Sequence, residues 1–361
     1  MALIDFKVLP GIDKQDTTSG AENRWIDCDN TRFRYGLPEK VGGWSSLVTD
    51  TIVGVARRQF AFVDLDGNRY IAIGTDKFLL IYFEGQLYDI TPLKTTLSSC
   101  TIATTSGSAV CSITKASHNL SAGDIVLLDN VTLPSGTGYS NSDFEDKLFQ
   151  VTSITSSSVF TITQSSNATA TVSTGGSLEV KPYEQIGPAE QSYGYGWGID
   201  AWGSGAWGEA ASASDVSLEP GLWSLSNFGQ VLVATIANGK TFTWNAGIAA
   251  RLTTRASTTT SGFSTSANPT ATRVTLVSPT TRHLIHLGTE TTIGDTSTQD
   301  DMFIRFSDQE DINDYTPTAI NSAGTQRLQD GTKIMGSLKG KETILVWTDN
   351  ALYTMKFIGA P

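Results

Sequence analysis

The residues that could bind a metal ion or move a proton are few and scattered. The three histidines are His118, His283 and His286. Two residues separate His283 from His286, so on a strand their side chains point to opposite faces and would not share one metal ion. The cysteines form no Cys-x-x-Cys pair, and their odd, sparse count predicts reduced thiols without a disulfide framework; they are Cys28, Cys100 and Cys111.

The densest group of carboxylates lies close to Tyr315 and consists of Asp308, Glu310, Asp311 and Asp314. A pair of carboxyl groups can hydrolyse a glycoside when one of them has a raised pKa, which makes a glycosidase one competing hypothesis. Acids in a turn-rich segment are more often simply solvated. The sequence also lacks the common nucleophile-elbow, zinc-protease and phosphate-cradle motifs. We therefore predict no enzyme, no catalytic or metal-ligating residue and no cofactor.

The segment from Asp64 to Asn68 resembles the start of a calcium-binding loop, which needs oxygen ligands around a glycine turn. The acidic residue expected six positions after Gly67 is absent, because Ile73 stands there. Apolar runs typical of strands flank the segment on both sides. A plain hairpin turn is therefore favoured over a calcium site.

The elements that position these residues are predicted to be short strands. Only 17% of the 361 residues are charged and 34 are glycine, which suits strands and turns better than long helices. Residues 58–91, 223–244 and 334–355 share the order strand, turn, strand, turn, strand, and 283–306 is a weaker copy. Asn238-Gly239 favours a tight hairpin turn with positive φ. Repeated meanders of this kind predict the blades of a β-propeller in an all-β protein.

A different composition separates the first two copies. Residues 93–180 are rich in serine and threonine and alternate with apolar residues, which predicts an inserted small β-sandwich or barrel. We expect residues 1–92 to form an N-terminal arm and the first blade. Residues 181–361 are expected to form a Trp/Gly-rich linker and further blades. Four blades are the lower limit for a closed propeller, so closure within this chain stays open.

Two sets of residues are candidates for a subunit interface. Arg32 and Arg34 alternate on a predicted strand and so point to one face, where ion pairing with acids of an adjacent subunit is favoured over contact with DNA. Trp197, Trp202 and Trp207 recur every five residues among glycines, a period that fits neither a helix nor a strand. We expect their rings to lie against a neighbouring surface, since aromatic side chains bury much area.

Charge and hydropathy narrow the classes of partner. The formal net charge of −11 disfavours binding of free nucleic acid, which depends on clustered lysine and arginine. No apolar run is long enough to span a membrane, and residues 1–10 do not resemble a signal peptide. The sequence predicts a soluble protein made in a cytoplasm.

Three stretches resemble the tail hub or nozzle proteins of short-tailed bacteriophages. The first is 24–44, which begins Arg-Trp-Ile-Asp-Cys-Asp-Asn and ends Val-Gly-Gly-Trp. The second is the Trp/Gly run at 193–207 with Gly-Leu-Trp-Ser-Leu-Ser-Asn-Phe-Gly at 221–229, and the third extends from 304 to 353. Residues 93–179 resemble only generic phage β-modules.

This resemblance implies a structural virion protein of the tail, made in the host bacterial cytoplasm. Such proteins form a ring, commonly of six copies, below the portal and adaptor. Expected partners are other copies of the chain, the adaptor or portal-side tail proteins, and a tail fibre or spike. DNA would pass through the channel without sequence-specific binding. Two competing hypotheses are a propeller-type adhesin that stacks sugars on the Trp/Gly segment, and the propeller glycosidase.

Overall fold

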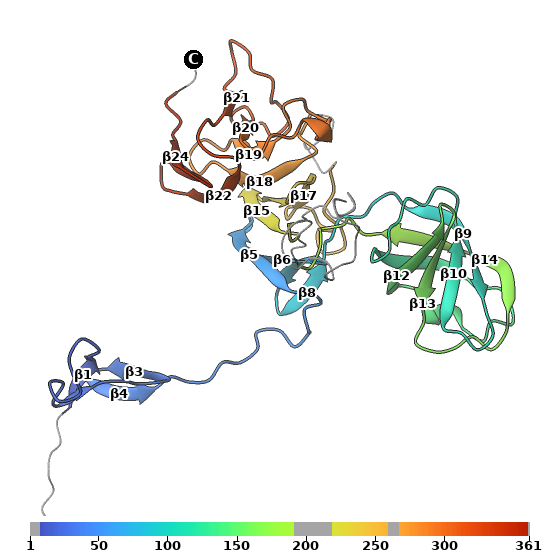
Figure 1. Ribbon diagram of the computed structural model, residues 1–361, viewed down its shortest axis with the longest axis horizontal. Coiled ribbons are helices and arrows are strands. Elements are labelled where there is room, and N and C mark those ends of the chain that lie inside the picture. The colour runs from blue at the N-terminus through green and yellow to red at the C-terminus, as the bar shows by residue number, and fades with distance from the viewer. Residues whose placement is uncertain (1–7, 191–218, 259–266, 360–361) are drawn as a thin grey trace, which may run out of the picture. The chain divides into compact units, whose positions relative to one another are not determined.

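The computed structural model describes residues 8–190, 219–258 and 267–359 (Figure 1). The chain divides into two units, Met1–Thr49 and Asp50–Pro361. Within the described residues nearly all regular structure is strand, and the two helices are single 3₁₀ turns at Asn141–Asp143 and Thr296–Thr298. The all-β prediction is therefore confirmed. None of the helices in these ranges has the length and hydropathy needed to cross a membrane.

The first unit is built from short strand pairs. Strands β1 (Leu9–Ile12) and β2 (Arg24–Trp25) pair in parallel, and β3 (Thr31–Arg34) and β4 (Leu37–Lys40) form an antiparallel hairpin. The turn of this hairpin is Tyr35-Gly36, where both residues have positive φ. Such a turn twists in the same sense as the strands that it joins.

The second unit contains four antiparallel meanders, called here the first to fourth sheets. The first sheet contains β5 (Ala56–Val63), β6 (Arg69–Thr75), β7 (Leu79–Phe83) and β8 (Gln86–Asp89), and the second contains β15 (Trp223–Phe228), β16 (Val231–Ile236) and β17 (Thr241–Asn245). The third sheet contains β18 (Thr272–Val277), β19 (Leu284–Thr289), β20 (Phe303–Phe306) and β21 (Gly324–Arg327). The fourth contains β22 (Ile334–Lys339), β23 (Ile344–Thr348) and β24 (Leu352–Met355). All four predicted meanders, including the weaker copy, are present.

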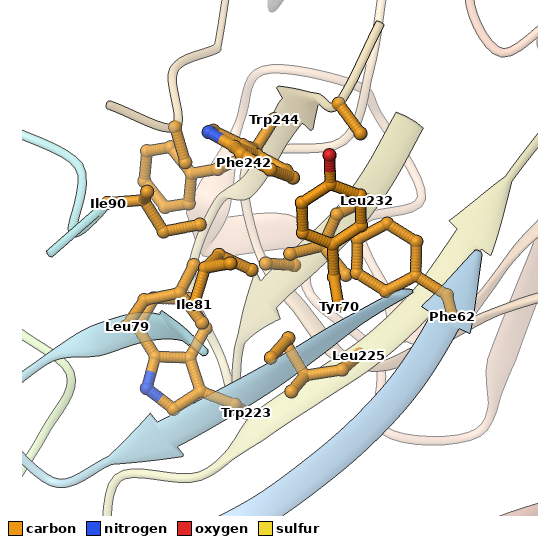
Figure 2. Close-up of a cluster of buried hydrophobic side chains, with 14 of the residues drawn as sticks. Phe62, Tyr70, Leu79, Ile81, Ile90, Trp223, Leu225, Leu232, Phe242 and Trp244 are labelled. Carbon is orange, nitrogen blue, oxygen red and sulfur yellow. The ribbon is translucent and has the colours of Figure 1, made fainter. Parts of the chain in front are cut away.

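The four sheets pack face against face in chain order. The first and second share a large apolar core that contains Tyr70, Trp223 and Trp244 (Figure 2). A smaller cluster with Val233 and Leu284 joins the second sheet to the third, and a further cluster joins the third to the fourth. Each fully buried large apolar side chain contributes roughly 1.5–3 kcal/mol, so the stacked faces hold the series together.

A six-stranded closed barrel follows the first sheet in the chain, in the order β10-β13-β12-β11-β14-β9. The structure therefore selects the barrel from the two predicted alternatives. Its strands are β9 (Leu97–Thr104), β10 (Val110–Thr114), β11 (Ile125–Thr132), β12 (Lys147–Ser156), β13 (Val159–Thr163) and β14 (Val172–Pro182). After the last strand, the Tyr183 ring packs edge-on against Phe78 of the first sheet at 5.5 Å, and its hydroxyl donates to Asp89 at 2.6 Å.

The first predicted turn is a plain hairpin. One carboxylate oxygen of Asp64 accepts hydrogen bonds from the backbone N–H groups of Asp66 and Asn68, and the other accepts from the Asn68 amide and the Tyr70 hydroxyl. The carboxylate therefore stabilises the turn itself, as carboxylate side chains in turns commonly do.

The middle strand of each of the three clear meanders is a short continuous apolar run, which predicts burial on both faces. This holds for β16, which is buried after its first residue. It is wrong for β23, where the Trp347 side chain is 37% exposed. The physical reason is that the fourth sheet packs on the third with one face, while Trp347 and its cross-strand neighbour Leu352 lie on the other face.

Candidate functional site

The first strands of all four sheets line one cavity of about 430 Å³. Its walls come from β5, β15, β18 and β22, together with residues 219–222 that lead into β15. A propeller arranges its blades around a central channel in this way. The cavity is therefore the place where the repeated sequence pattern converges in space.

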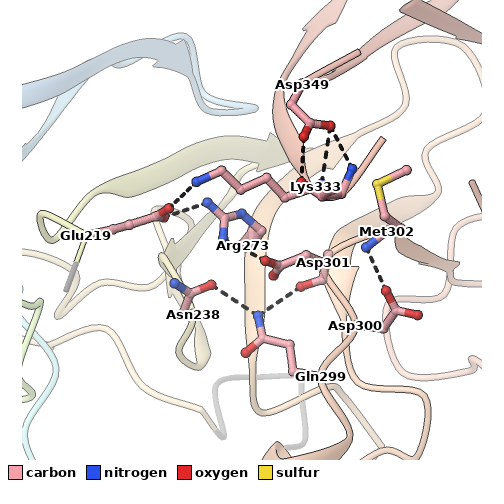
Figure 3. A network of polar contacts seen from close by, with 11 residues as sticks. Glu219, Asn238, Arg273, Gln299, Asp300, Asp301, Met302, Lys333 and Asp349 are labelled. Carbon is pink, nitrogen blue, oxygen red and sulfur yellow. Dashed lines mark hydrogen bonds and ion pairs between the residues drawn. The ribbon is translucent and has the colours of Figure 1, made fainter. Parts of the chain in front are cut away.

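One side of the cavity is neutralised by a network of ion pairs (Figure 3). Glu219 accepts a hydrogen bond from Arg273 at 2.5 Å and from Lys333 at 2.6 Å. Arg273 also faces Asp301 at 3.3 Å, and its side chain is only 14% exposed. Burial alone would raise the pKa of Glu219, but the two cations outweigh burial and lower it. The carboxylate is therefore held in its charged form.

This network joins segments that are distant in sequence. Glu219 precedes the second sheet, Arg273 lies on β18 of the third, and Lys333 precedes β22 of the fourth. Removing one partner from such a set leaves a poorly solvated charge, which costs far more free energy than an exposed pair contributes. The network thus holds the second, third and fourth sheets together near the first residues of β15, β18 and β22.

The other side of the cavity carries Arg58 from β5 and Lys339 from β22. The ammonium of Lys339 donates to the Ser226 hydroxyl at 2.5 Å and lies 5.8 Å from the centre of the Phe60 ring. The pKa of Lys339 is lowered, first by the loss of water around the ammonium and then by repulsion from Arg58. Two like charges therefore face the same space.

The predicted histidines have separate structural partners. His286 on β19 is fully buried and bonds the Thr272 hydroxyl through Nδ1 at 3.1 Å and the Tyr315 hydroxyl through Nε2 at 2.9 Å. Burial, with a smaller contribution from Arg305, lowers the pKa of His286 to about 3. His283 instead contacts Ser322 through Nε2 at 3.0 Å. The two imidazoles do not converge on one metal ion.

Asp308 of the acidic cluster is held by hydrogen bonds from two loop residues. The carboxylate of Asp308 accepts hydrogen bonds from the hydroxyl and the backbone N–H of Ser322 and from the N–H of Gln309. The hydrogen bonds from Ser322 are the main reason that the pKa of Asp308 is lowered. A catalytic general acid requires a shift in the opposite direction.

One group of carboxylates in the barrel is close enough to share a cation. Ligand oxygens of Asp129, Glu145 and Asp146 lie within 4.8 Å of one another. Asp129 already pairs with Lys181, and Glu145 accepts from the backbone N–H of Val131 at 2.7 Å. These acids therefore already serve the barrel's own loops.

The predicted interface arginines belong to the first unit. Arg32 and Arg34 alternate as the exposed residues of β3, and Arg32 pairs with Glu39 of β4 at 3.1 Å. Ion pairing of Arg32 thus occurs within its own hairpin, and pairing with an adjacent subunit stays a prediction. The tryptophans of the Trp/Gly run, Trp197, Trp202 and Trp207, lie outside the described residues.

The cavity residues themselves were not predicted as a site. Glu219, Arg273, Lys333 and Lys339 belong to segments up to 120 positions apart on the sequence, each in an unremarkable local context. Only the alignment of the repeated meanders could have found them, because β5, β15, β18 and β22 occupy the same position in each repeat.

Comparison with known proteins gives no family for the chain. No family model matches it, and no curated protein matches it. Among solved structures, the phage phi92 endosialidase is similar with a TM-score of 0.23 and 14% sequence identity. That match covers 77% of this chain and 39% of the endosialidase chain, so the present chain spans less than half of its length. The functional interpretation therefore rests on the residues of this chain and not on the comparisons.

Proposed function

We propose that the chain is a structural subunit of a phage tail, of the hub or nozzle type, that assembles into a ring around the DNA exit path. The observation that supports this most is the series of four meanders packed face to face around one cavity, combined with the phage-like stretches at 24–44, 221–229 and 304–353.

The proposed work is mechanical. The stacked apolar faces and the Glu219 network would keep the sheets from sliding past one another, as the wall of a DNA channel requires. A ring needs heterologous contacts that close on themselves, because isologous pairing stops at two copies. The net charge of −11 per chain would limit adhesion of DNA to the wall.

A charge exchange in the first unit tests whether its hairpin contributes to the ring. Arg32→Glu alone removes the pair with Glu39, whereas the double variant Arg32→Glu, Glu39→Arg restores that pair in reversed order. We expect the double variant to fold but not to assemble, since a neighbour's acid would now face Glu at position 32. Assembly is measured by light scattering after size-exclusion chromatography, with and without adaptor protein.

The exposed pair Lys14–Asp27 in the same unit, at 3.1 Å, provides the control, and its exchange should leave assembly unchanged. Full assembly of the Arg32, Glu39 double variant would show that this hairpin is not part of the interface. A chain that stays monomeric beside its tail partners and binds glycans would contradict the ring and favour the adhesin hypothesis.

A further inference from the structure

The cavity between the first strands is unevenly charged. On one side Arg273 and Lys333 are matched by Glu219 and Asp301. On the other, no carboxylate within residues 8–190, 219–258 and 267–359 forms an ion pair with Arg58 or Lys339. Both basic side chains line the cavity, so a positive potential remains at that end.

The two cations repel each other across the cavity that they line. Burial first, and the charge of Arg58 second, lower the pKa of Lys339. Lys339 is also fixed in place by its hydrogen bond to Ser226 at 2.5 Å, while Arg58 is open to solvent. An anion between them would relieve the repulsion and gain charge-assisted hydrogen bonds.

The wall next to the two cations is apolar. Phe60 lies beneath the ammonium of Lys339, and Met335 and Leu338 of β22 are exposed cavity-lining residues. A bound group would therefore meet a positive end and an apolar side. This combination suits an oxyanion carried by a small organic body, as in ligand sites where a few polar groups orient the ligand.

We propose that Arg58 and Lys339 form a binding site for a small oxyanion, a carboxylate or a phosphate, at the cavity between the first strands of the four sheets. The site does not depend on the ring, because all of its residues belong to one chain. It is separate from the Glu219 network, whose cations already have partners.

Calorimetric titration of the full chain tests this site, with inorganic phosphate and glucuronate as the two probes at matched ionic strength in chloride. We expect one probe to bind once per chain, which also identifies the anion class. Arg58→Gln and Lys339→Met should each weaken binding by at least about tenfold, the effect of one charge-assisted hydrogen bond. Arg69→Gln in the same sheet and Lys341→Met in the β22–β23 turn are matched controls outside the cavity and should bind as the original chain does.

A second measurement separates binding from folding. In buffer without phosphate or carboxylate, Lys339→Met should unfold at the same temperature as the original chain or higher, because the repulsion from Arg58 is gone. If Lys339 served only to hold Ser226, the variant would unfold at a lower temperature with or without probe. That result, absence of binding by both probes, or an affinity in either cavity variant equal to that of the original chain would each overturn the proposal.

Discussion

Buried neutral His286 should make the third sheet sensitive to acid. Its pKa is about 3 in the folded chain, against an ordinary value of 6.5, because burial disfavours the imidazolium. Between pH 6.5 and pH 3 the unfolded state therefore binds more protons than the folded state. Stability from this group is fully present above pH 6.5 and is lost as the pH falls toward 3.

The size of this effect follows from the two pKa values. Between pH 7 and pH 5 the proton uptake by the unfolded chain amounts to about 2 kcal/mol, since each pKa unit corresponds to about 1.4 kcal/mol. Most carboxylates stay ionised over this range, so their contribution is small. The variant His286→Gln keeps a polar group that can reach Tyr315 but cannot be protonated.

Hydrogen exchange of peptides that contain β19 measures the local free energy of opening at the two pH values, after correction for the intrinsic exchange rate. The original chain should lose about 2 kcal/mol more than His286→Gln between pH 7 and pH 5. His118→Gln, a change to a buried histidine of the barrel, should not alter the dependence at β19. Equal pH dependence in the original chain and His286→Gln would refute the assignment of a neutral buried imidazole.

Two further changes test the packing. Trp244→Ala should destabilise the first and second sheets by about 3–5 kcal/mol, whereas Trp44→Ala, at a fully exposed position, should change stability by less than about 0.5 kcal/mol in denaturant unfolding followed by tryptophan fluorescence. Glu219→Gln should lower the free energy of unfolding by about 1–3 kcal/mol, because Arg273 loses its main partner. Glu342→Gln is the control and should be nearly neutral, because Glu342 pairs with Lys356 in an exposed ion pair. Equal losses of stability in the two variants would contradict a structural role for the Glu219 network.

The elements set by local chemistry could be predicted from the sequence. Asn238 adopts positive φ at 58° in the β16–β17 hairpin, and Asp64 stabilises the first turn. Both features depend only on residues close by in the sequence, so they form without help from tertiary packing. The weaker copy at 283–306 can also be predicted, because its apolar runs are long enough to indicate strands. The long loop before Phe303 leaves the pairing register of its two strands undetermined by the sequence.

The contacts within the site could not be predicted from local sequence patterns, for a physical reason. Glu219 and Lys333 meet only after three sheets have stacked, and nothing near either residue in the sequence indicates that contact. The placement of Arg58 and Lys339 in one cavity has the same origin. The acidic cluster at Asp308, in contrast, is visible in the sequence, but the hydrogen bond of Asp308 to Ser322, 14 positions away, is not.

The most direct test of the central claim is the mass of the purified chain by native mass spectrometry, alone and after addition of the adaptor-side tail protein. The proposed function predicts a closed ring of defined copy number, six by resemblance to hub and nozzle proteins, in at least the second condition. A mass that stays at one chain, 38.6 kDa, in both conditions would contradict it.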